Sequence, residues 1–503
     1  MENKKLINGL IKNIGKDSLY YIPGRIIPAL IGFIGLWIYT RVYTPNEYGN
    51  YVLVTATVSM FSVFSYIWLN NANLRFFAAY RNDNKLERFF STSFFSLVAS
   101  ITISLLAIFV LASLSLISGT LTDFILIIAG LLISTSFTET LMTILRTDRQ
   151  AKYISLFRSL SAISSIAITL TLIFIFHTGI ISILLGQFLA DMTISVLIFF
   201  KFNFLRLLRI RYFSITAFKE FINYGSPFLI LSLSAWALTL SNRFIINYYL
   251  GEADVGIYSA ASQLGTYPIE MTSMMIILAA FPVIIDNWEK NGDESTKTLV
   301  PTIIKYYMLI TIPIFFALFL LSPEVTALIG SKYEAGSSII PWVSLAAICS
   351  GINMYTDIGL QLKKKTIFIS IVMVISAISN IALNFLFVPL YGFYGSAISS
   401  ALSQVIFLAL TWAISQRYLP LKFPTGTFVK CVAASVVMYL LLALAKATVL
   451  PEVSMVSLVT LTVSGCICYF ITIYALGELR TEVEAVKEMF AARKEIILLK
   501  SRV

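Results

Sequence analysis

The sequence is poor in the residues that build most metal, redox and nucleotide sites. It has one histidine, His177, and four cysteines, Cys349, Cys431, Cys466 and Cys468, in 503 residues. Because all four cysteines lie within apolar stretches, neither a disulfide framework nor a zinc site is indicated. His177 lies in a short turn, where we expect an ordinary solvated side chain. No glycine-rich run ends in Gly-Lys-Ser or Gly-Lys-Thr, so there is no ATP-binding loop. The sequence therefore predicts neither a metal site nor a cofactor.

Charged residues are also scarce, at 13%, whereas apolar residues make up 58% and include 38 Phe and 25 Tyr. The apolar residues form runs of about 20 residues, the length that crosses a hydrocarbon core as a helix. The sequence therefore predicts an all-α polytopic membrane protein with fourteen spans. We expect these at 18–40, 49–70, 92–117, 121–143, 153–176, 180–200, 222–249, 255–284, 302–321, 337–361, 366–388, 393–415, 428–448 and 454–476.

The lysines and arginines predict the orientation of these spans. In the fourteen-span topology, 32 of the 37 basic residues lie on one side of the membrane, which is the cytoplasm by the positive-inside rule. They lie in residues 4–16, 75–88, 146–158, 201–219, 290–305, 363–365, 417–430 and 480–502. We therefore expect both termini in the cytoplasm. The net charge of +11 then needs no nucleic-acid partner.

The connections on the opposite side are short, and the longest runs from Ser322 to Ala335. They leave no room for an external catalytic domain, which argues against a membrane glycosyltransferase or polysaccharide polymerase. The sequence therefore predicts a protein that is not an enzyme.

One short pattern occurs twice, 207 residues apart. Glu47, Gly49 and Tyr51 alternate with other residues after the first span, and Asp254, Gly256 and Tyr258 do so after the seventh. Each copy follows a span that has proline in its opening turns and arginine at its exit. Similar halves are typical of transporters, in which two lobes move about a central site.

Polar residues within spans are costly in lipid and usually face an interior. In span eight they recur every three or four residues, at Ser259, Ser262, Gln263, Thr266, Glu270 and Ser273. We expect this stripe to line a cavity. Packing of small residues between helices is the alternative; it explains the serines but not Gln263 and Glu270.

Spans seven and one have similar faces. Span seven places Thr239, Asn242 and Arg243 together, and span one places Arg25 beside small residues. Both arginines either line a cavity or reach toward the membrane surface. Guanidinium groups bind phosphate or carboxylate bidentately, so arginines in an interior suit an anionic ligand. Further intramembrane carboxylates are Glu139, Asp191 and Asp357, each of which has pairing with a nearby basic residue as its alternative role.

Several segments together resemble the bacterial polysaccharide transporters, the Wzx-type oligosaccharide (O-antigen) flippases of the multidrug/oligosaccharidyl-lipid/polysaccharide exporter superfamily. The segments are residues 44–51, 242–246, 256–261, 281–282, 330–333, 363–366, 384–389 and 392–398. The resemblance extends over the whole chain. This sequence departs from it at Asn242-Arg243, where the family typically has Asp-Arg, which argues against an Asp-based charge or proton role here.

The resemblance implies two pseudo-symmetric six-helix lobes followed by two further helices. We expect an N-terminal lobe at 1–200, a basic cytoplasmic linker at 201–221, a C-terminal lobe at 222–415, two spans within 416–477 and an amphipathic cytoplasmic tail at 478–503. A partly disordered tail is the alternative for the last segment.

The implied function is translocation of an undecaprenyl-pyrophosphate-linked oligosaccharide across the bacterial inner membrane by alternating access. The expected partners are this substrate, membrane lipid, and a polysaccharide polymerase with its chain-length regulator. We expect substrate contacts from Arg25, Arg75, Thr239, Asn242, Arg243, Gln263 and Thr266, and ion coupling by Glu270, Asp191 or Asp357. A cation-coupled multidrug exporter and a lipid II flippase are the alternatives.

Overall fold

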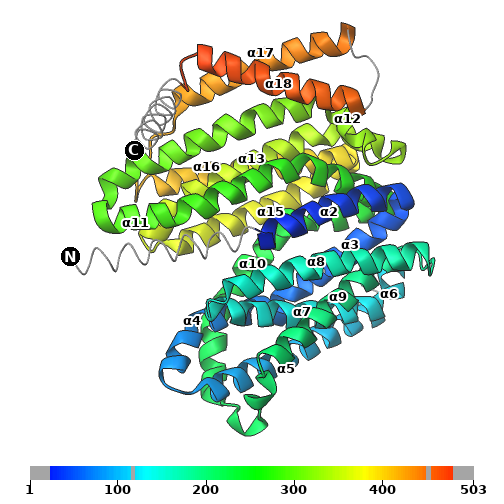
Figure 1. Cartoon of the computed structure of the whole chain (residues 1–503), viewed down its shortest axis with the longest axis vertical. Coiled ribbons are helices and arrows are strands. Elements are labelled where there is room, and N and C mark those ends of the chain that lie inside the picture. The colour runs from blue at the N-terminus through cyan, green and yellow to red at the C-terminus, as the bar shows by residue number, and fades with distance from the viewer. Residues whose placement is uncertain (1–22, 115–118, 449–454, 480–503) are drawn as a thin grey trace, which may run out of the picture. The chain divides into compact units, whose positions relative to one another are not determined.

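The computed structural model of the chain describes residues 23–114, 119–448 and 455–479. In this part of the chain the regular structure is entirely helical, as expected where hydrocarbon offers the backbone no hydrogen-bond partners. The predicted all-α fold is confirmed (Figure 1). The helices before residue 251 are α2 (Pro23–Val42), α3 (Pro45–Ser62), the π-helix η1 (Val63–Ile67), α4 (Trp68–Asn82), α5 (Leu86–Ser113), α6 (Gly119–Asp123), α7 (Ile125–Thr147), α8 (Ala151–Phe174), α9 (Ile181–Lys201), the 3-10 helices η2 (Phe204–Arg206) and η3 (Ile210–Tyr212), and α10 (Ile215–Leu250). The later helices are α11 (Glu252–Leu320), α12 (Ser322–Ala327), the 3-10 helix η4 (Ser331–Ile339), α13 (Ile340–Thr356), α14 (Ile358–Leu362), α15 (Thr366–Tyr391), α16 (Phe393–Ser415), α17 (Thr425–Thr448) and α18 (Met455–Ala475).

The predicted number of spans agrees with the structure once α11 is divided at its kink. Thirteen helices in the described residues are long and apolar enough to cross a membrane. One of them is α11, in which Gly292 has a non-helical φ of 70° and ψ of −156°. This residue divides α11 into two arms, 252–291 and 293–320, and Figure 1 shows the chain folding back there. Counting the arms separately gives the fourteen predicted spans.

Several helices extend beyond the spans predicted for them. The second span was expected at 49–70, but α3, η1 and α4 form one continuous helical stretch from Pro45 to Asn82. Helix α10 starts at Ile215, after Ser214, whose side chain accepts a hydrogen bond from the Ala217 amide. The apolar run marks where a chain enters the hydrocarbon, and a helix continues past that point into water.

Contacts between Cα atoms divide the described chain into two compact units. Unit 1 comprises the residues up to Ala260 together with Ser370–Ser403, and unit 2 comprises Ala261–Ile369 together with the residues from Gln404. The predicted lobe boundaries and linker are a different division and stay a prediction. Beyond Leu479 the predicted amphipathic tail lies outside the described residues.

In unit 1 the helices pack closely where small residues meet. Helix α8 packs against both α2 and α9, and α10 packs against α4 (Figure 1). A Cβ added at Gly24 of α2 would lie 2.6 Å from the Ser155 Cα of α8. A Cβ at Gly225 of α10 would likewise lie 2.6 Å from the Trp68 carbonyl oxygen. Small residues that allow backbones to approach are the usual means of helix association in membranes.

The two copies of the repeated pattern contact each other reciprocally. A Cβ at Gly49 of α3 would lie 1.9 Å from the Glu252 carbonyl oxygen, and a Cβ at Gly256 of α11 would lie 1.9 Å from the Pro45 carbonyl oxygen. Each glycine therefore faces the first turn of the other helix. The approximate twofold relation between the copies is visible in this contact, and it explains why both copies have glycine.

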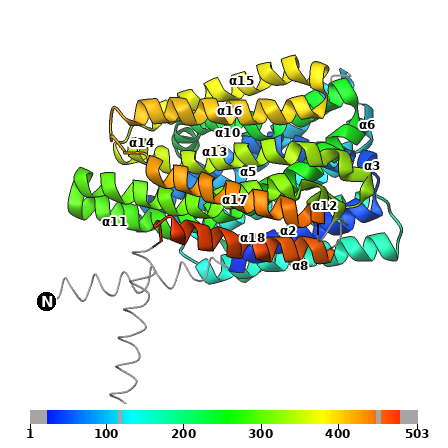
Figure 2. The same cartoon turned by 90° about the horizontal axis from the view of Figure 1, so that it is seen from above.

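In unit 2 the helices α17 and α18 run alongside each other, as Figures 1 and 2 both show. Helix α17 is joined to α12 by an ion pair between the Lys446 Nζ and the Glu324 Oε1, 2.6 Å apart. The Glu324 side chain is only 2% exposed. Loss of the lysine would leave a buried carboxylate uncompensated, which is strongly destabilising.

Three turns end their helices in the same way. Asn84, Arg149 and Lys364 each have φ of 56–58°, in the left-handed region. The next amide donates back to a carbonyl five residues earlier: Lys85 to Tyr80, Gln150 to Leu145 and Lys365 to Leu360, at 2.7–2.9 Å. This bond closes a helix C-terminus in the Schellman manner, usually with glycine at the left-handed position. Here each of the three positions carries a side chain.

The reciprocal glycine contact predicts a large difference between two similar substitutions. Gly49→Ala places a methyl group against the Glu252 carbonyl and must push α3 and α11 apart. Gly426→Ala in α17 is the control: a Cβ there would have no atom within 4 Å, so alanine is tolerated. We expect Gly49→Ala to lower the stability of the detergent-solubilised protein by roughly 1–3 kcal/mol. Thermal unfolding of both variants measures this. Equal midpoints would contradict the contact.

Candidate functional site

A charged pair lies between α7 and α8 of unit 1. The Arg158 guanidinium donates two hydrogen bonds to the Glu139 carboxylate, from Nη1 to Oε1 at 2.8 Å and from Nη2 to Oε2 at 2.7 Å. Both side chains are largely buried, with 33% and 27% of their surface exposed. The fork geometry gives a strong, directional pair. For Glu139, the alternative of pairing with a nearby arginine is confirmed.

Asp191 of α9 has a different environment. Its Oδ1 accepts a hydrogen bond from the Ser161 hydroxyl at 3.0 Å, and its Oδ2 accepts one from Thr135 at 3.3 Å. In the described part of the chain Asp191 forms no ion pair. Its carboxylate is therefore held by neutral donors while the nearby Glu139 is matched by Arg158.

Asn242 and Arg243 of α10 are joined by hydrogen bonds. The buried Asn242 donates from Nδ2 to the Tyr258 hydroxyl at 2.7 Å, and its Oδ1 accepts from the Arg243 Nη1 at 3.4 Å. The same Nη1 donates to the Thr239 carbonyl oxygen at 2.8 Å. An amide supplies both a donor and an acceptor, which a carboxylate cannot do. The Thr239 hydroxyl donates to its own helix, at the Ala235 carbonyl.

The polar network around Asn242 continues into α15 and α16. The Asn380 Nδ2 donates to the Ser403 hydroxyl at 2.8 Å, and the Asn384 Nδ2 donates to the Asn380 Oδ1 at 3.2 Å. The Ser400 hydroxyl lies 3.4 Å from that of Tyr258. These residues were not predicted from the sequence, although the spacing of Asn380 and Asn384 by four within an apolar span was the available signal.

The other two predicted arginines lie at exposed positions in unit 1. Arg25 is in the first turn of α2, next to Gly24 where α2 crosses α8, and Arg75 is in the middle of α4. Arg41, at the end of α2, lies over the Trp37 ring with its Cζ 4.5 Å from the centroid.

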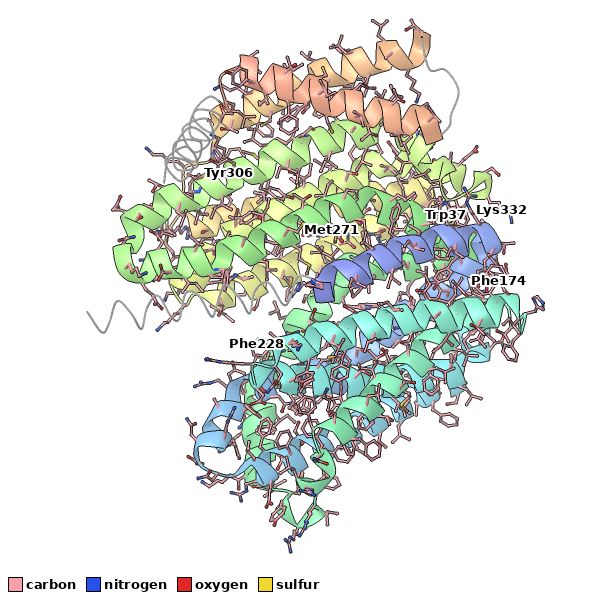
Figure 3. All side chains as sticks on the ribbon, viewed as in Figure 1. Trp37, Phe174, Phe228, Met271, Tyr306 and Lys332 are labelled. Carbon is pink, nitrogen blue, oxygen red and sulfur yellow. The ribbon has the colours of Figure 1, made fainter. Side chains whose placement is uncertain are left out.

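The predicted stripe of span eight divides into two groups. Ser259, Ser262 and Ser273 are buried, and the Ser273 hydroxyl lies 3.2 Å from that of Tyr307 on the second arm of α11. Gln263 and Thr266 are partly buried, and Glu270 is exposed. All three lie on the first arm of α11, on which Figure 3 labels Met271. All three serines are therefore buried, and Ser273 contacts the second arm, whereas the prediction that the stripe lines a cavity stays a prediction. The accessible members of the stripe are Gln263, Thr266 and Glu270.

Asp357 lies between α13 and α14, where its Oδ1 accepts a hydrogen bond from the Gln361 Nε2 at 3.1 Å. Together with Gln263, Thr266 and Glu270 it belongs to unit 2, whereas the other predicted site residues belong to unit 1. Within unit 1, hydrogen bonds unite Thr239, Asn242 and Arg243. The assignment of all these residues to one binding site stays a prediction.

The Glu139–Arg158 pair predicts a characteristic pattern in a double-mutant cycle. Arg158→Met removes the two hydrogen bonds to the Glu139 carboxylate. We expect it to lower the free energy of unfolding by roughly 1–3 kcal/mol, a value between those typical of exposed and of buried ion pairs. Arg158→Met with Glu139→Gln should recover part of that loss. Thermal unfolding measures both. The exposed Lys290–Asp286 pair, with side chains 51% and 59% exposed, is the control, because its removal should change little. A double variant less stable than Arg158→Met would refute the interpretation.

Comparison with known proteins places these features in a family. Residues 14–288, more than half of the chain, match the family described as polysaccharide biosynthesis protein. The chain is 23% identical over 417 residues to a putative O-antigen transporter of Shigella flexneri, covering 80% of this chain and 97% of that protein. It is 22% identical over 221 residues to a probable low-salt glycan biosynthesis flippase of Haloferax volcanii, covering 44% of this chain. That match spans about half of the relative, 47% of its length.

Solved structures share the fold. The lipid II flippase MurJ in an inward closed conformation superposes with a TM-score of 0.74 at 17% identity, covering 93% of this chain and 99% of that one. A multidrug resistance transporter of the MATE family in an inward-facing conformation gives 0.61 at 18% identity, covering 80% and 94%. The predicted resemblance and the polytopic transporter fold are confirmed. The chain belongs to the polysaccharide biosynthesis protein family.

Proposed function

We propose that the chain is a flippase that moves an undecaprenyl-pyrophosphate-linked oligosaccharide across the inner membrane by alternating access. The observation that carries the proposal is the combination of a polysaccharide biosynthesis sequence with the fold of a lipid II flippase over nearly its whole length. A relative named as an O-antigen transporter aligns over 97% of its length. The transported glycan is an oligosaccharide repeat unit of a surface polysaccharide.

The charge of the substrate defines what its binding site must supply. A pyrophosphate that crosses a low-dielectric core needs compensating positive charge, because an unpaired ion there costs several kcal/mol or more. Arg243 fits this requirement. It is partly buried, and its guanidinium is oriented by the Thr239 carbonyl and the Asn242 side chain. Arg25 and Arg75 supply further guanidinium groups at exposed positions. Thr239, Gln263 and Thr266 present side chains suited to sugar hydroxyls.

The surroundings of Asp191 support a role for this residue in ion coupling. The Asp191 carboxylate interacts electrostatically with the Glu139–Arg158 pair, so these three groups carry one uncompensated negative charge when all are ionised. A proton or a monovalent cation at Asp191 would neutralise it. Glu270 remains the corresponding candidate in unit 2, where it is exposed on α11. Asp357 is the third candidate.

This function places the protein in the bacterial inner membrane with both termini in the cytoplasm, as the distribution of basic residues predicts. The substrate must be supplied by enzymes that assemble sugars on the lipid. On the other side it must be consumed by a polymerase that works with a chain-length regulator, which we propose as functional partners.

We predict that replacing Arg243 or Arg25 reduces transport without affecting membrane insertion. The purified protein is reconstituted into vesicles with radiolabelled lipid-linked oligosaccharide, and movement of the glycan across the bilayer is measured. We expect Arg243→Ala and Arg25→Ala to reduce transport at least tenfold with normal membrane insertion, because a charge-assisted contact to phosphate is lost. Lysine at either position should restore transport only in part, since it lacks the bidentate fork.

The matched control is Arg81→Ala, which removes an arginine paired with Asp148 at an exposed position. It should transport at the unmodified rate. Full complementation of a transporter-null strain by both alanine variants at native expression would reject the assignment of these arginines. Export of ethidium instead of glycan by the same vesicles would favour a multidrug exporter and reject the proposed substrate.

Coupling is tested with an imposed proton or sodium gradient. Glu270→Gln and Asp191→Asn keep hydrogen bonding but cannot change charge, so the variant at the coupling group should bind substrate yet lose gradient-driven transport. If Glu270→Gln responds to the gradient as the unmodified protein does, Glu270 returns to a packing or sugar-binding role. An unchanged response in both variants would leave Asp357 as the remaining candidate.

A further inference from the structure

A continuous hydrogen-bonded network of neutral side chains begins at Asn242 of α10. The Asn242 Nδ2 donates to the Tyr258 hydroxyl at 2.7 Å and to the Ser400 hydroxyl at 3.5 Å. The Ser400 carbonyl oxygen accepts from the Ser403 hydroxyl at 3.0 Å, and that hydroxyl accepts from the Asn380 Nδ2 at 2.8 Å. All of these residues belong to unit 1. The network therefore joins α10 and the start of α11 to α15 and α16 within one unit.

The network lies in the interior of unit 1. Asn242 is 4% exposed and Tyr258 is 2% exposed, whereas Asn380 and Ser403 are fully buried. Each of these side chains carries an amide or a hydroxyl group, which is uncharged at neutral pH. Because a buried charge is costly unless it is paired, a network of this kind holds its helices together at no electrostatic cost.

Arg243 determines which way the Asn242 amide points. A guanidinium group donates hydrogen bonds and accepts none, so the amide oxygen must face it. The Arg243 Nη1 donates to this oxygen at 3.4 Å and to the Thr239 carbonyl oxygen at 2.8 Å. The amide NH2 group then faces Tyr258. Asn242 therefore orients the guanidinium through its oxygen and is itself held in place through its nitrogen.

An aspartate at position 242 would occupy the same space but would change the charge. Its carboxylate would take the place of the Oδ1 that now accepts from the Arg243 Nη1, and would form an ion pair with the guanidinium. The same carboxylate would repel any anion that approaches Arg243, and this repulsion grows with the charge of the anion. A pyrophosphate ester carries more negative charge than a phosphate monoester, so its binding would be weakened more.

We propose that Asn242 is a specificity-determining residue, which makes the site selective for a lipid pyrophosphate over a lipid monophosphate. Asn242 positions Arg243 and places no negative charge beside it. This inference rests on the proposed function, in which Arg243 contacts the pyrophosphate of the lipid-linked glycan. Selection by charge keeps the polyprenyl monophosphate, which has the same tail but carries no glycan, from competing for the transporter.

Binding of two lipids with the same tail tests this proposal. Undecaprenyl pyrophosphate and undecaprenyl phosphate are titrated against the purified protein in detergent, and the ratio of their dissociation constants measures the selectivity. Contacts with the tail cancel in this ratio. We expect the unmodified protein to bind the pyrophosphate more tightly. Asn242→Asp should weaken binding of the pyrophosphate about tenfold and of the phosphate about threefold, because the added repulsion scales with the charge of the ligand.

Three further variants separate the effect of charge from that of the network. Tyr258→Phe removes the hydroxyl that Asn242 binds but leaves Arg243 both of its acceptors, so it should keep the selectivity unchanged. Ser400→Asp adds a carboxylate one step further from Arg243 and should lower the selectivity by a smaller factor than Asn242→Asp. Asn82→Asp adds the same charge at an exposed residue that ends α4, and it should change neither dissociation constant.

Unchanged selectivity in Asn242→Asp, or in Ser400→Asp if the first variant does not fold, would overturn the proposal. An equal fall in selectivity in Tyr258→Phe would assign the effect to the network and would overturn the role of charge. Equal binding of the two lipids by the unmodified protein would overturn it as well. If the unmodified protein binds neither lipid, the proposed function fails together with this inference. If it prefers the pyrophosphate and Asn242→Asp keeps that preference, only the assignment to Asn242 fails.

Discussion

The backbone contact between Gly49 and Gly256 orients the elements on which the polar interior of unit 1 depends. It fixes the start of α11, and Tyr258 lies in the second turn of that helix, two residues after Gly256. Tyr258 accepts the hydrogen bond of Asn242, and Asn242 in turn holds Arg243. A methyl group at either glycine would therefore disturb more than helix packing. It would move the anchor of the guanidinium that we assign to the pyrophosphate.

The carboxylates in unit 1 differ in how their charge is compensated. Arg158 and Glu139 satisfy each other through a two-bond fork, so this pair needs nothing from outside the helices. Asp191 is held by the hydroxyls of Ser161 and Thr135, which stabilise a carboxylate without neutralising it. A proton or a cation can therefore change the net charge at Asp191 without breaking an ion pair, which is why Asp191, and not Glu139, is one of the proposed coupling candidates.

Most of the fold was predictable, because the length and apolarity of a span are imposed by the membrane itself. Fourteen spans were expected, and the glycine at 292 makes two of them appear as one long helix. The true helix ends were harder to predict, because α4 continues to Asn82 and α10 begins at Ile215 in regions too polar to be counted as spans. The candidate site was harder still. Asn380, Asn384 and Ser403 form a buried network whose members come from two helices, and a sequence pattern on one helix cannot show that they meet. The spacing of the serines in span eight likewise did not show that all three are buried.

The three turns at Asn84, Arg149 and Lys364 show how topology and folding compete for the same residue. A left-handed backbone costs a residue with a side chain roughly 1–2 kcal/mol, and glycine avoids this cost. Arginine and lysine at two of these positions, and Lys85 directly after the third, place cations at helix C-termini, where they complement the helix dipole. In the proposed topology, the same cations retain the loop on the cytoplasmic side during insertion. In that topology, glycine at Arg149 or Lys364 would relax the backbone of the folded protein but would remove a charge that orients the loop during insertion.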